Sequence, residues 1–201
     1  MYKFREIPLT NNSISKIKPV YGFGVNDSKY KVTAKVDGKW VMCKIYRKWQ
    51  GMLERCYSSK YHVKKPTYKD CVVCDEWLLF SNFKTWMEKQ EWHDMELDKD
   101  LLGEGKLYSP ENCIFIPQKI NTLLQGGKSN KKSGLPAGVK ASGSNYQARC
   151  SNGSGINIHI GNFKTKELAS AAYTTFKKLR ILNEAKKQPM QIRLAMENYV
   201  R

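Results

Sequence analysis

The sequence lacks any apolar run near the 18 residues that a membrane-spanning helix requires. Its first residues, MYKFREIPLTNNS, also lack the apolar core of a secretory signal peptide. These absences predict an intracellular protein without a membrane partner, in which most of the six cysteines are reduced. The sequence contains no internal repeat either.

Acidic residues are scarce relative to basic ones. Against 35 Lys and Arg residues there are 18 Asp and Glu residues, which gives a formal net charge of +17. Such an excess attracts polyanions and releases their counterions, so it favours a nucleic-acid partner over a ribosome-like or anionic-membrane partner, or over a role in solubility alone. The charge is concentrated in residues 126–201, where 14 basic and 3 acidic residues give a net charge of +11.

The few acids are unevenly placed, since seven of them lie between Glu88 and Glu104. An acidic cluster weakens polyanion binding unless it faces away from the ligand or holds a cation. Two interpretations therefore stay open, a solvated face and a divalent metal site.

A segment poor in apolar residues, QGGKSNKKSGLP at 125–136, predicts a flexible basic linker between two domains. The first domain is expected at 1–124, with its core at about 46–124. The second is expected at 137–183, followed by a tail at 184–201 that forms a short helix. The expected fold class is α+β.

The first domain carries signals for a hairpin and two amphipathic helices. Alternation in KYKVTAKVDGKWVM around an Asp-Gly turn predicts the hairpin. In YRKWQGMLERCY the apolar positions recur at i, i+3, i+4 and i+7 from Trp49, and DEWLLFSNFKTWMEKQ repeats this pattern as a single second helix. Two short strands, Glu96–Leu101 and Cys113–Ile116, then flank a turn, and Pro117 starts a helix over QKINTLL.

The second domain is predicted to be a three-stranded sheet packed on one helix. GVKASGSNYQARCSNGSGINIHIGNFKT contains three alternating segments separated by turns. Thr165 is expected to cap a helix over KELASAAYTTFKKLRIL, whose apolar stripe is expected to include Leu168 and Leu179.

The motifs of the two halves resemble two known domains, in the order seen in phage homing endonucleases. YRKWQGMLERCY, YKDCVVCDEWLLFSNFKTWM, LDKDLLGEGKLYSPENCIFIP and QKINTLL, over about 80 residues, resemble the HNH or ββα-metal nucleases of phages and introns. The GV start, the GNFKT before the helix and the Ala-Ala-Tyr within it resemble the Apetala or ethylene-response-factor DNA-binding domain. The resemblance implies a phage-type endonuclease that binds double-stranded DNA in the cytoplasm of an infected bacterial host and has no small-molecule substrate.

The HNH resemblance implies a role for each polar residue of the first domain. It implies that Asp98 and Asn121 are ligands of one Mg²⁺ or Mn²⁺ ion, and that Asp100 is a further ligand or a supporting group. Lys99 stands where those enzymes have the histidine that deprotonates water, and Asn112 where they have the residue that orients it. Asn121 follows Asn112 by nine residues, as the family pattern requires.

A lysine at the base position changes the expected chemistry. Histidine titrates near pH 6.5, whereas free lysine has a pKa of about 10.4, which neighbouring acids raise further. Lys99 is therefore expected to stay protonated and to contact phosphate. Three alternatives stay open: the metal or His93 activates the water, the enzyme nicks slowly, or the fold only binds DNA as a regulator, packaging factor or anti-host factor.

The ethylene-response-factor resemblance implies that the outer face of the sheet enters the major groove. Arg149 is best suited to read guanine, because its planar fork can bond O6 and N7 together. Lys140, Lys164 and the linker lysines are expected to meet phosphates. The expected DNA-binding residues are Lys140, Tyr146, Gln147, Arg149, Asn157, His159 and Lys164, with Lys128, Lys131 and Lys132 in the linker.

A single Cys-x-x-Cys motif, Cys71 to Cys74, raises the question of zinc. Cys56 and Cys113 would complete four thiolate ligands of a structural Zn²⁺ ion. Zinc-bearing HNH folds usually show two such pairs, so buried and reduced core cysteines are favoured over zinc.

Overall fold

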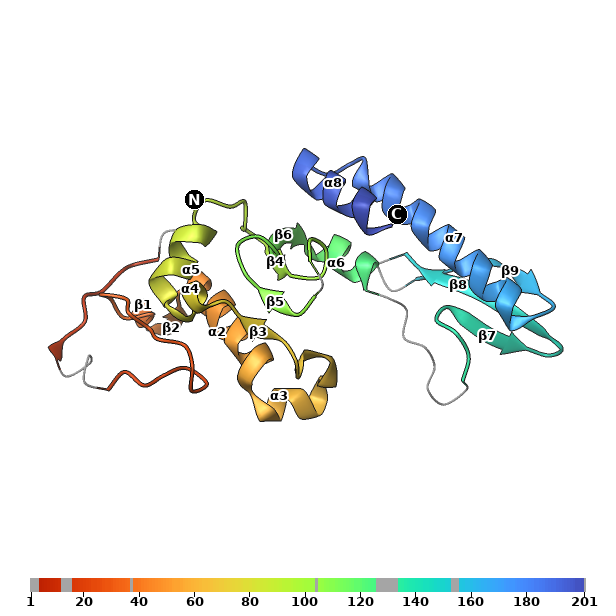
Figure 1. Ribbon diagram of the computed structural model, residues 1–201. Coiled ribbons are helices and arrows are strands. Elements are labelled where there is room, and N and C mark those ends of the chain that lie inside the picture. The colour runs from red at the N-terminus through yellow and green to blue at the C-terminus, as the bar shows by residue number, and fades with distance from the viewer. Residues whose placement is uncertain are drawn as a thin grey trace. The chain divides into compact units, whose positions relative to one another are not determined.

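The computed structural model describes residues 4–11, 16–36, 38–103, 105–125, 134–152 and 156–200. Over these ranges the chain is a mixture of helices and small sheets, as expected for the α+β class (Figure 1). Among the described residues no helix has both the length and the apolar character that crossing a membrane requires. The chain divides into two compact units, the first formed by Met1–His93 and Leu97–Phe115, the second by Asp94–Glu96 and Ile116–Arg201.

The first unit is built from short helices and two-stranded sheets. Its elements in chain order are β1 (Thr33–Val36), β2 (Lys39–Met42), α2 (Lys44–Tyr57), α3 (Ser59–Lys64), the 3₁₀ helix η1 (Pro66–Tyr68), β3 (Val72–Val73), α4 (Asp75–Leu78), α5 (Phe80–Met87) and β5 (Leu107–Tyr108). The predicted hairpin is confirmed, because β1 pairs antiparallel with β2. A second, separate sheet is formed by β3 and β5, which pair in parallel.

Aromatic side chains form the core of the first unit. Trp49 on α2 is fully buried, its ring centroid lies 5.4 Å from that of Phe80 on α5, and its Nε1 donates to the carbonyl oxygen of Trp77 at 2.6 Å. Gly24 lies directly against this cluster, where a Cβ atom would stand 2.3 Å from Leu53 Cδ1. Only a glycine allows the backbone to approach α2 so closely.

The single helix predicted over DEWLLFSNFKTWMEKQ is wrong in one respect, because Leu79 interrupts it. Leu79 has an extended backbone between α4 and α5 (φ −87, ψ 126) and bridges to Val25. The Val25 amide donates to the Leu78 carbonyl at 2.8 Å, and the Phe80 amide donates to the Val25 carbonyl at 3.0 Å. These bonds with a distant segment replace the helical bonds that the local pattern predicted.

The predicted strand, loop, strand and helix at the end of the first domain are present. β4 (Met95–Asp98) and β6 (Ile114–Pro117) form a two-stranded sheet, and both strands contain residues assigned to each unit. The elements that follow are α6 (Gln118–Leu124), β7 (Val139–Ser142), β8 (Asn145–Ser151), β9 (Asn157–Phe163), α7 (Lys166–Ala185) and α8 (Met190–Tyr199).

The second unit contains the predicted three-stranded sheet on one helix. β7, β8 and β9 are antiparallel, and their inner face packs on α7 around Ala148 and Ala169, which are both fully buried. Thr165 caps α7 as predicted, since its Oγ1 accepts from the Leu168 amide at 3.2 Å. Leu168 itself is 55% exposed, so it does not belong to the buried stripe. Leu179 is exposed to the same extent, and the residues of α7 that are buried are Ala169, Tyr173, Ile181 and Ala185.

The helix α6 belongs to the second unit, although the sequence placed it in the first domain. Lys119 Nζ on α6 lies 3.2 Å from Glu184 Oε2 on α7. At the end of α6, the carbonyl oxygen of Gln125 accepts from Lys177 Nζ on α7 at 2.9 Å. The units thus divide before α6, and residues 126–133 of the predicted linker lie outside the described residues. The predicted helix in the tail is confirmed as α8.

Candidate functional site

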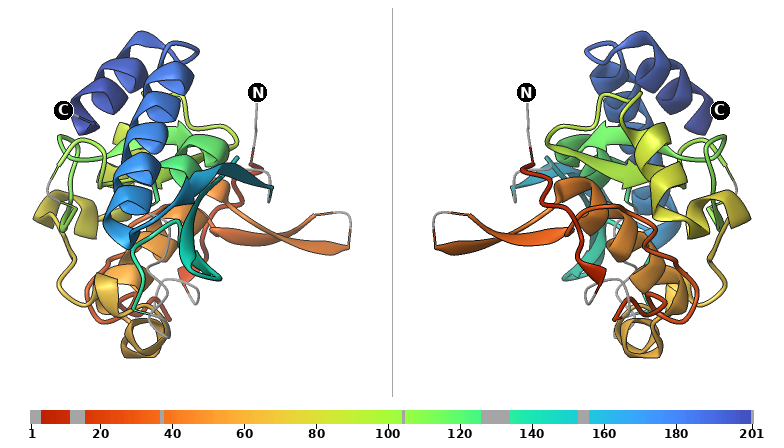
Figure 2. Two further views of the ribbon diagram at one scale, coloured as in Figure 1. Left: turned by 90° about the vertical axis from the view of Figure 1, so that its right-hand side faces the viewer. Right: turned by 90° about the vertical axis from the view of Figure 1, so that its left-hand side faces the viewer.

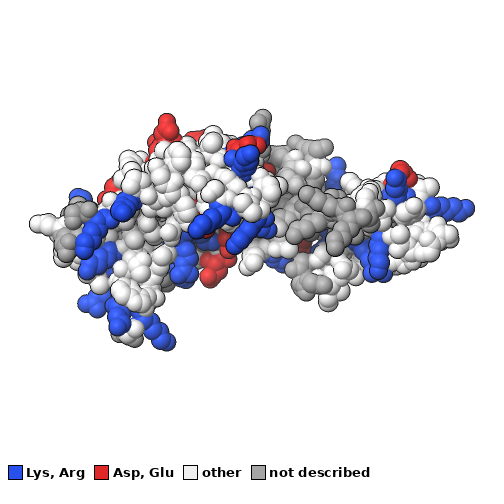
Figure 3. Space-filling model, turned by 90° about the horizontal axis from the view of Figure 1, so that it is seen from below, with Lys and Arg blue, Asp and Glu red and all other residues white. Residues whose placement is uncertain are grey.

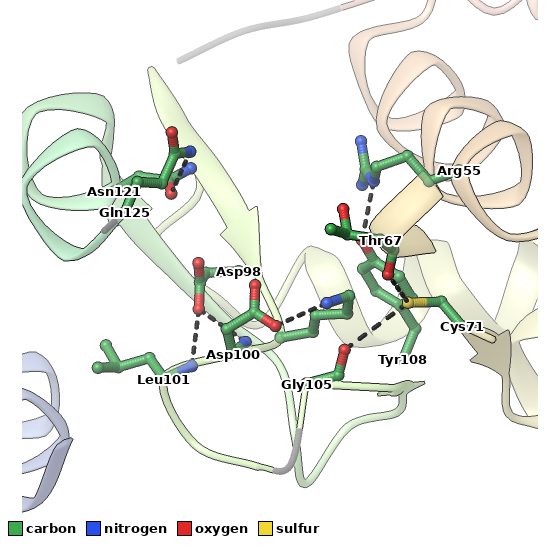
Figure 4. A network of polar contacts seen from close by, with 11 residues as sticks. Arg55, Thr67, Cys71, Asp98, Asp100, Leu101, Gly105, Tyr108, Asn121 and Gln125 are labelled. Carbon is green, nitrogen blue, oxygen red and sulfur yellow. Dashed lines mark hydrogen bonds and ion pairs between the residues drawn. The ribbon is translucent and has the colours of Figure 1, made fainter. Parts of the chain in front are cut away.

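Asp98 ends β4 and holds the turn that follows it. Its Oδ1 accepts from the amides of Asp100 at 2.9 Å and Leu101 at 2.8 Å (Figure 4). The residue is only 8% exposed, and burial raises the pKa of its carboxyl group, even though the two amide bonds act in the opposite direction. Asp98 Oδ1 therefore stabilises the turn that follows β4.

Lys99 is buried and protonated. Its Nζ lies 2.6 Å from Asp100 Oδ1 and stands 5.2 Å and 5.7 Å from the ring centroids of Tyr68 and Tyr108. Burial by itself lowers the pKa of this ammonium group, but the hydrogen bond and charge of Asp100 outweigh burial and the pKa is raised. The group is thus unsuited to accept a proton from water, and it contacts Asp100 and aromatic rings instead of presenting its charge to solvent.

Two glycines allow the loop between β4 and β5 to close on these side chains. Gly105 has a φ of +76, and a Cβ atom there would stand 2.4 Å from Asp100 Oδ1. A Cβ atom at Gly103 would stand 2.8 Å from Asn112 Oδ1, so the Asn112 side chain lies against this loop. Within the described chain no hydrogen bond links Asn112 to Lys99.

The remaining two candidates, His93 for proton removal and Asn121 for metal binding, each have a partner of their own. His93 is exposed and stacks on the ring of Trp92, with centroids 4.0 Å apart. Asn121, on α6, belongs to the second unit, where its Oδ1 accepts from Gln125 Nε2 at 3.3 Å. Its pairing with Asp98 around one ion stays a prediction.

The Asp98 carboxylate can supply one ligand oxygen to a divalent ion. No residue in the described part of the chain donates a hydrogen bond to Asp98 Oδ2, which leaves this oxygen available as a ligand. Mg²⁺ is commonly held by one or two carboxylates and keeps several waters, so one free oxygen is a usable donor. The described residues contain no group of three or more His, Cys, Asp or Glu side chains that could hold a metal ion, and a richer protein cage is absent there.

The four cysteines considered for zinc are free thiols of the first unit. Cys56, Cys71 and Cys113 are buried and Cys74 is partly exposed. Burial raises the pKa of both Cys56 and Cys113 to about 12, which keeps these thiols protonated. Cys71 Sγ donates to the Gly105 carbonyl at 3.7 Å. In this structure these side chains therefore have the surroundings of buried, protonated thiols, and zinc binding stays an untested alternative.

A ladder of polar side chains crosses the outer face of the C-terminal sheet. Arg149 Nη2 donates to Gln147 Oε1 at 2.6 Å, and Gln147 Nε2 donates to Ser142 Oγ at 3.0 Å. In the strand register Lys140 lies opposite Gln147, and His159 lies opposite Arg149. Directly paired residues of antiparallel strands share a face, so these five side chains lie together.

The strand alternation sorts the other predicted DNA contacts. Tyr146 packs against the core on the helix side, together with Ala148 and Cys150, and is therefore not on the outer face. Asn157 is exposed and lies on the outer face at the end of β9. The sequence interpretation missed Ser142 and Asn162, which share this face; the cross-strand register was the signal that could have found them.

The charge of this sheet has one sign. Residues 139–163 include no Asp or Glu, and Lys140, Arg149 and Lys164 are exposed. Figure 3 shows Lys and Arg side chains at many places on one side of the chain and Asp and Glu side chains at fewer. Lys128, Lys131 and Lys132 lie outside the described residues.

The chain matches no protein-family model, no curated protein and no solved structure. The resemblance to HNH and ethylene-response-factor domains therefore rests on the sequence motifs alone.

Proposed function

We propose that this protein is an HNH-type DNA endonuclease that binds double-stranded DNA through the outer face of β7, β8 and β9 and nicks it at Asp98. The observation that carries the DNA-binding half is the ladder of Arg149, Gln147 and Ser142 on a sheet without acidic residues. Such a surface attracts phosphates and presents ordered donors and acceptors at the same time.

Arg149 is the residue that we assign to base recognition. The bond to Gln147 Oε1 occupies Nη2 and fixes the plane of the guanidinium group, so less side-chain entropy is lost when the remaining N–H groups meet a base. A bidentate contact of this kind discriminates against a wrong base by about 1–3 kcal/mol. Lys140, exposed beside the ladder, is assigned to a phosphate.

The hydrolytic half of the proposal rests on Asp98. Oδ1 holds the turn through the amides of Asp100 and Leu101, so the direction of the free Oδ2 is fixed. A divalent ion at Oδ2 would supply stabilisation of the negative charge that develops on the phosphate. Asp100 keeps Lys99 protonated and turned inward, which leaves the chain without a general base at this position.

Lys99 at the base position also favours a second candidate function, DNA binding without cleavage. Removal of general-base help lowers a rate by typically 10²–10⁴-fold. A protein with a protonated and buried Lys99 at the base position would also be suited to bind DNA without cutting it. The alternative is therefore a DNA-binding protein with a degenerate nuclease fold.

Nicking of supercoiled plasmid in Mg²⁺ or Mn²⁺ separates the two. The matched variant is Asp98→Asn, which retains an oxygen acceptor for the two amides and loses the charge that a cation needs. Nicked circles from the wild type alone, abolished by a chelator, support the endonuclease. Equal nicking by both proteins indicates a contaminant, and no nicking together with tight duplex binding establishes the second candidate. Absence of duplex binding would overturn both.

A further inference from the structure

The hairpin of β1 and β2 carries an exposed tryptophan. Trp40 is 75% exposed, whereas Trp49 and Trp77 are 0% and 1% exposed. The hairpin extends away from the helices of its own unit (Figure 2). Burial of a large apolar side chain stabilises a fold by about 1.5–3 kcal/mol, and Trp40 contributes little of this to the folded chain.

The strand register shows which face of the hairpin is outward. Lys35 lies directly opposite Trp40, and Ala34 lies opposite Val41. Ala34 is 3% exposed, so the face with Ala34 and Val41 is the one that packs. Trp40 and Lys35 share the other face, where an indole ring and an ammonium group are side by side and both are open to solvent.

The surroundings of this indole are basic. Between Ser28 and Leu53 the sequence has seven Lys or Arg residues and one acid, Asp37. Exposed lysines flank the hairpin and occupy its strands, namely Lys29, Lys31, Lys35 and Lys39. An exposed aromatic plane among cations is the combination that binds unpaired nucleotides, because bases stack on the ring while lysines meet the phosphates.

We propose that this hairpin is a second nucleic-acid contact, which holds an unpaired base by stacking on Trp40 while Lys35, on the same face, binds the adjacent phosphate. An unpaired base is the favoured occupant, because stacking within an intact duplex first requires unstacking of base pairs, at a few kcal/mol per step. The choice of nucleic acid rests on the proposed function, but the hairpin and the C-terminal sheet are separate surfaces and can be tested separately.

Binding to a single-stranded oligonucleotide and to a duplex with an internal bubble tests the proposal. Trp40→Ala is expected to weaken binding to both by roughly 5- to 150-fold, the range for loss of one base–aromatic stack. Trp40→Phe should restore most of the affinity. Lys35→Ala should lower the salt dependence on single strands by about 0.7. Val63→Ala, at an apolar position that is 82% exposed, and Lys89→Ala, at a lysine between acids, are the matched controls.

Tryptophan fluorescence gives a direct readout. In the free protein, iodide should quench a highly accessible component that is absent from Trp40→Phe, because Trp49, Trp77 and Trp92 are buried and Trp86 is only partly exposed. Single-stranded DNA should protect this component. Protection without loss of affinity in Trp40→Ala, or equal effects of the hairpin variants and the controls, would overturn the proposal.

Binding to an intact duplex distinguishes the hairpin proposal from the sheet proposal. An intact duplex should bind Trp40→Ala as it binds the wild type, and should bind Arg149→Ala weakly. If Arg149→Ala has no effect on the duplex while the hairpin variants lose the single strand, the sheet assignment fails and the hairpin inference stands. The reverse pattern rejects the hairpin alone.

Discussion

Lys99 Nζ lies 2.6 Å from Asp100 Oδ1, and the two partners of this ion pair differ in exposure: the lysine side chain is 7% exposed and the aspartate 59%. Exposed ion pairs contribute little to stability. Here the cation is enclosed by protein and faces two tyrosine rings, so Asp100 is its only charged partner among the hydrogen bonds of the described residues. The pair therefore sets both the stability and the protonation state of the candidate site.

Removal of Asp100 should be more harmful than removal of Lys99. Asp100→Ala leaves a buried ammonium group without its hydrogen-bond acceptor, and such a loss destabilises by about 1–3 kcal/mol. Lys99→Met removes the buried charge itself and keeps the shape of the side chain. Urea unfolding of both variants and of the double variant gives the comparison; a larger loss in Lys99→Met would contradict this account of the pair.

The raised pKa of Lys99 predicts a loss of stability in alkali. A group whose pKa is higher in the folded state stabilises fully below its unfolded pKa, about 10.4 for lysine, and loses that contribution as the pH rises through the folded value. The difference in unfolding free energy between wild type and Lys99→Met should therefore change above about pH 10.4 and stay constant from pH 7 to 9. Denaturant titrations over this pH range measure it.

Asp98→Asn is expected to stabilise the protein at neutral pH. Burial raises the pKa of the Asp98 carboxyl in the folded state. The carboxyl therefore contributes most to the free energy of unfolding below about pH 3.9, where it is protonated in both the folded and the unfolded protein. This contribution is lost as the pH rises through the folded pKa. Asparagine stays neutral and keeps an acceptor for the two amides. The variant should have the higher Tm at pH 7, and the gain should vanish in acid. An unchanged or lower Tm at pH 7 would show that the two amide bonds need the charge.

Gly105→Ala should destabilise more than Gly38→Ala. Both glycines have nearly the same backbone, with φ values of +76 and +77, so the strain of a left-handed alanine is shared. A Cβ atom at Gly105 meets Asp100 Oδ1 at 2.4 Å, whereas nothing lies within 4 Å of one at Gly38. Each change should cost about 1–3 kcal/mol for strain, with a further loss at Gly105 alone. Equal unfolding free energies would show that the Asp100 side chain gives way.

Arg149→Ala and Lys140→Ala should weaken duplex binding in different ways. Loss of the Arg149 fork should cost about 1–3 kcal/mol at the preferred sequence and relax the preference at one base. Loss of Lys140 should weaken all sequences equally and lower the salt dependence by about 0.9. Fluorescence anisotropy with a panel of duplexes at several salt concentrations distinguishes the two, and identical profiles would refute the assigned roles.

Local sequence signals predicted several regular elements of each unit and missed α3, η1, β3 and β5 in the first. The helix over QKINTLL, the hairpin at an Asp-Gly turn and the Thr165 cap are set by residues that lie within a few positions of one another. The break at Leu79 was not predictable in this way, because its cause is a bridge to Val25, far away in the chain. Leu168 was misplaced because it lies on the exposed side of the first turn of α7, where periodicity alone does not define the buried side.

The candidate site was predictable in its composition and not in its contacts. The sequence indicated a protonated Lys99, and the reason given, nearby acid, agrees with the bond to Asp100. It did not indicate that the ammonium group turns inward toward Tyr68 and Tyr108, because those rings come from other segments. The outer face of the sheet was predicted only in part: Tyr146 was placed on it but packs on the helix side. Ser142 and Asn162 were missed because they become neighbours of Gln147 only through pairing.

Lys177 on α7 donates a hydrogen bond to the carbonyl oxygen of Gln125, the residue that begins the predicted linker. Gln125 at one end and Gly138 at the other both belong to the second unit, and Gly138 lies against Tyr173 of α7. The two residues that flank the predicted linker therefore belong to one unit, and the division between the units lies before α6. An insertion between Gln125 and Gly138 lengthens a connection whose two ends are in the same unit, at about 0.6 kcal/mol for each doubling of its length.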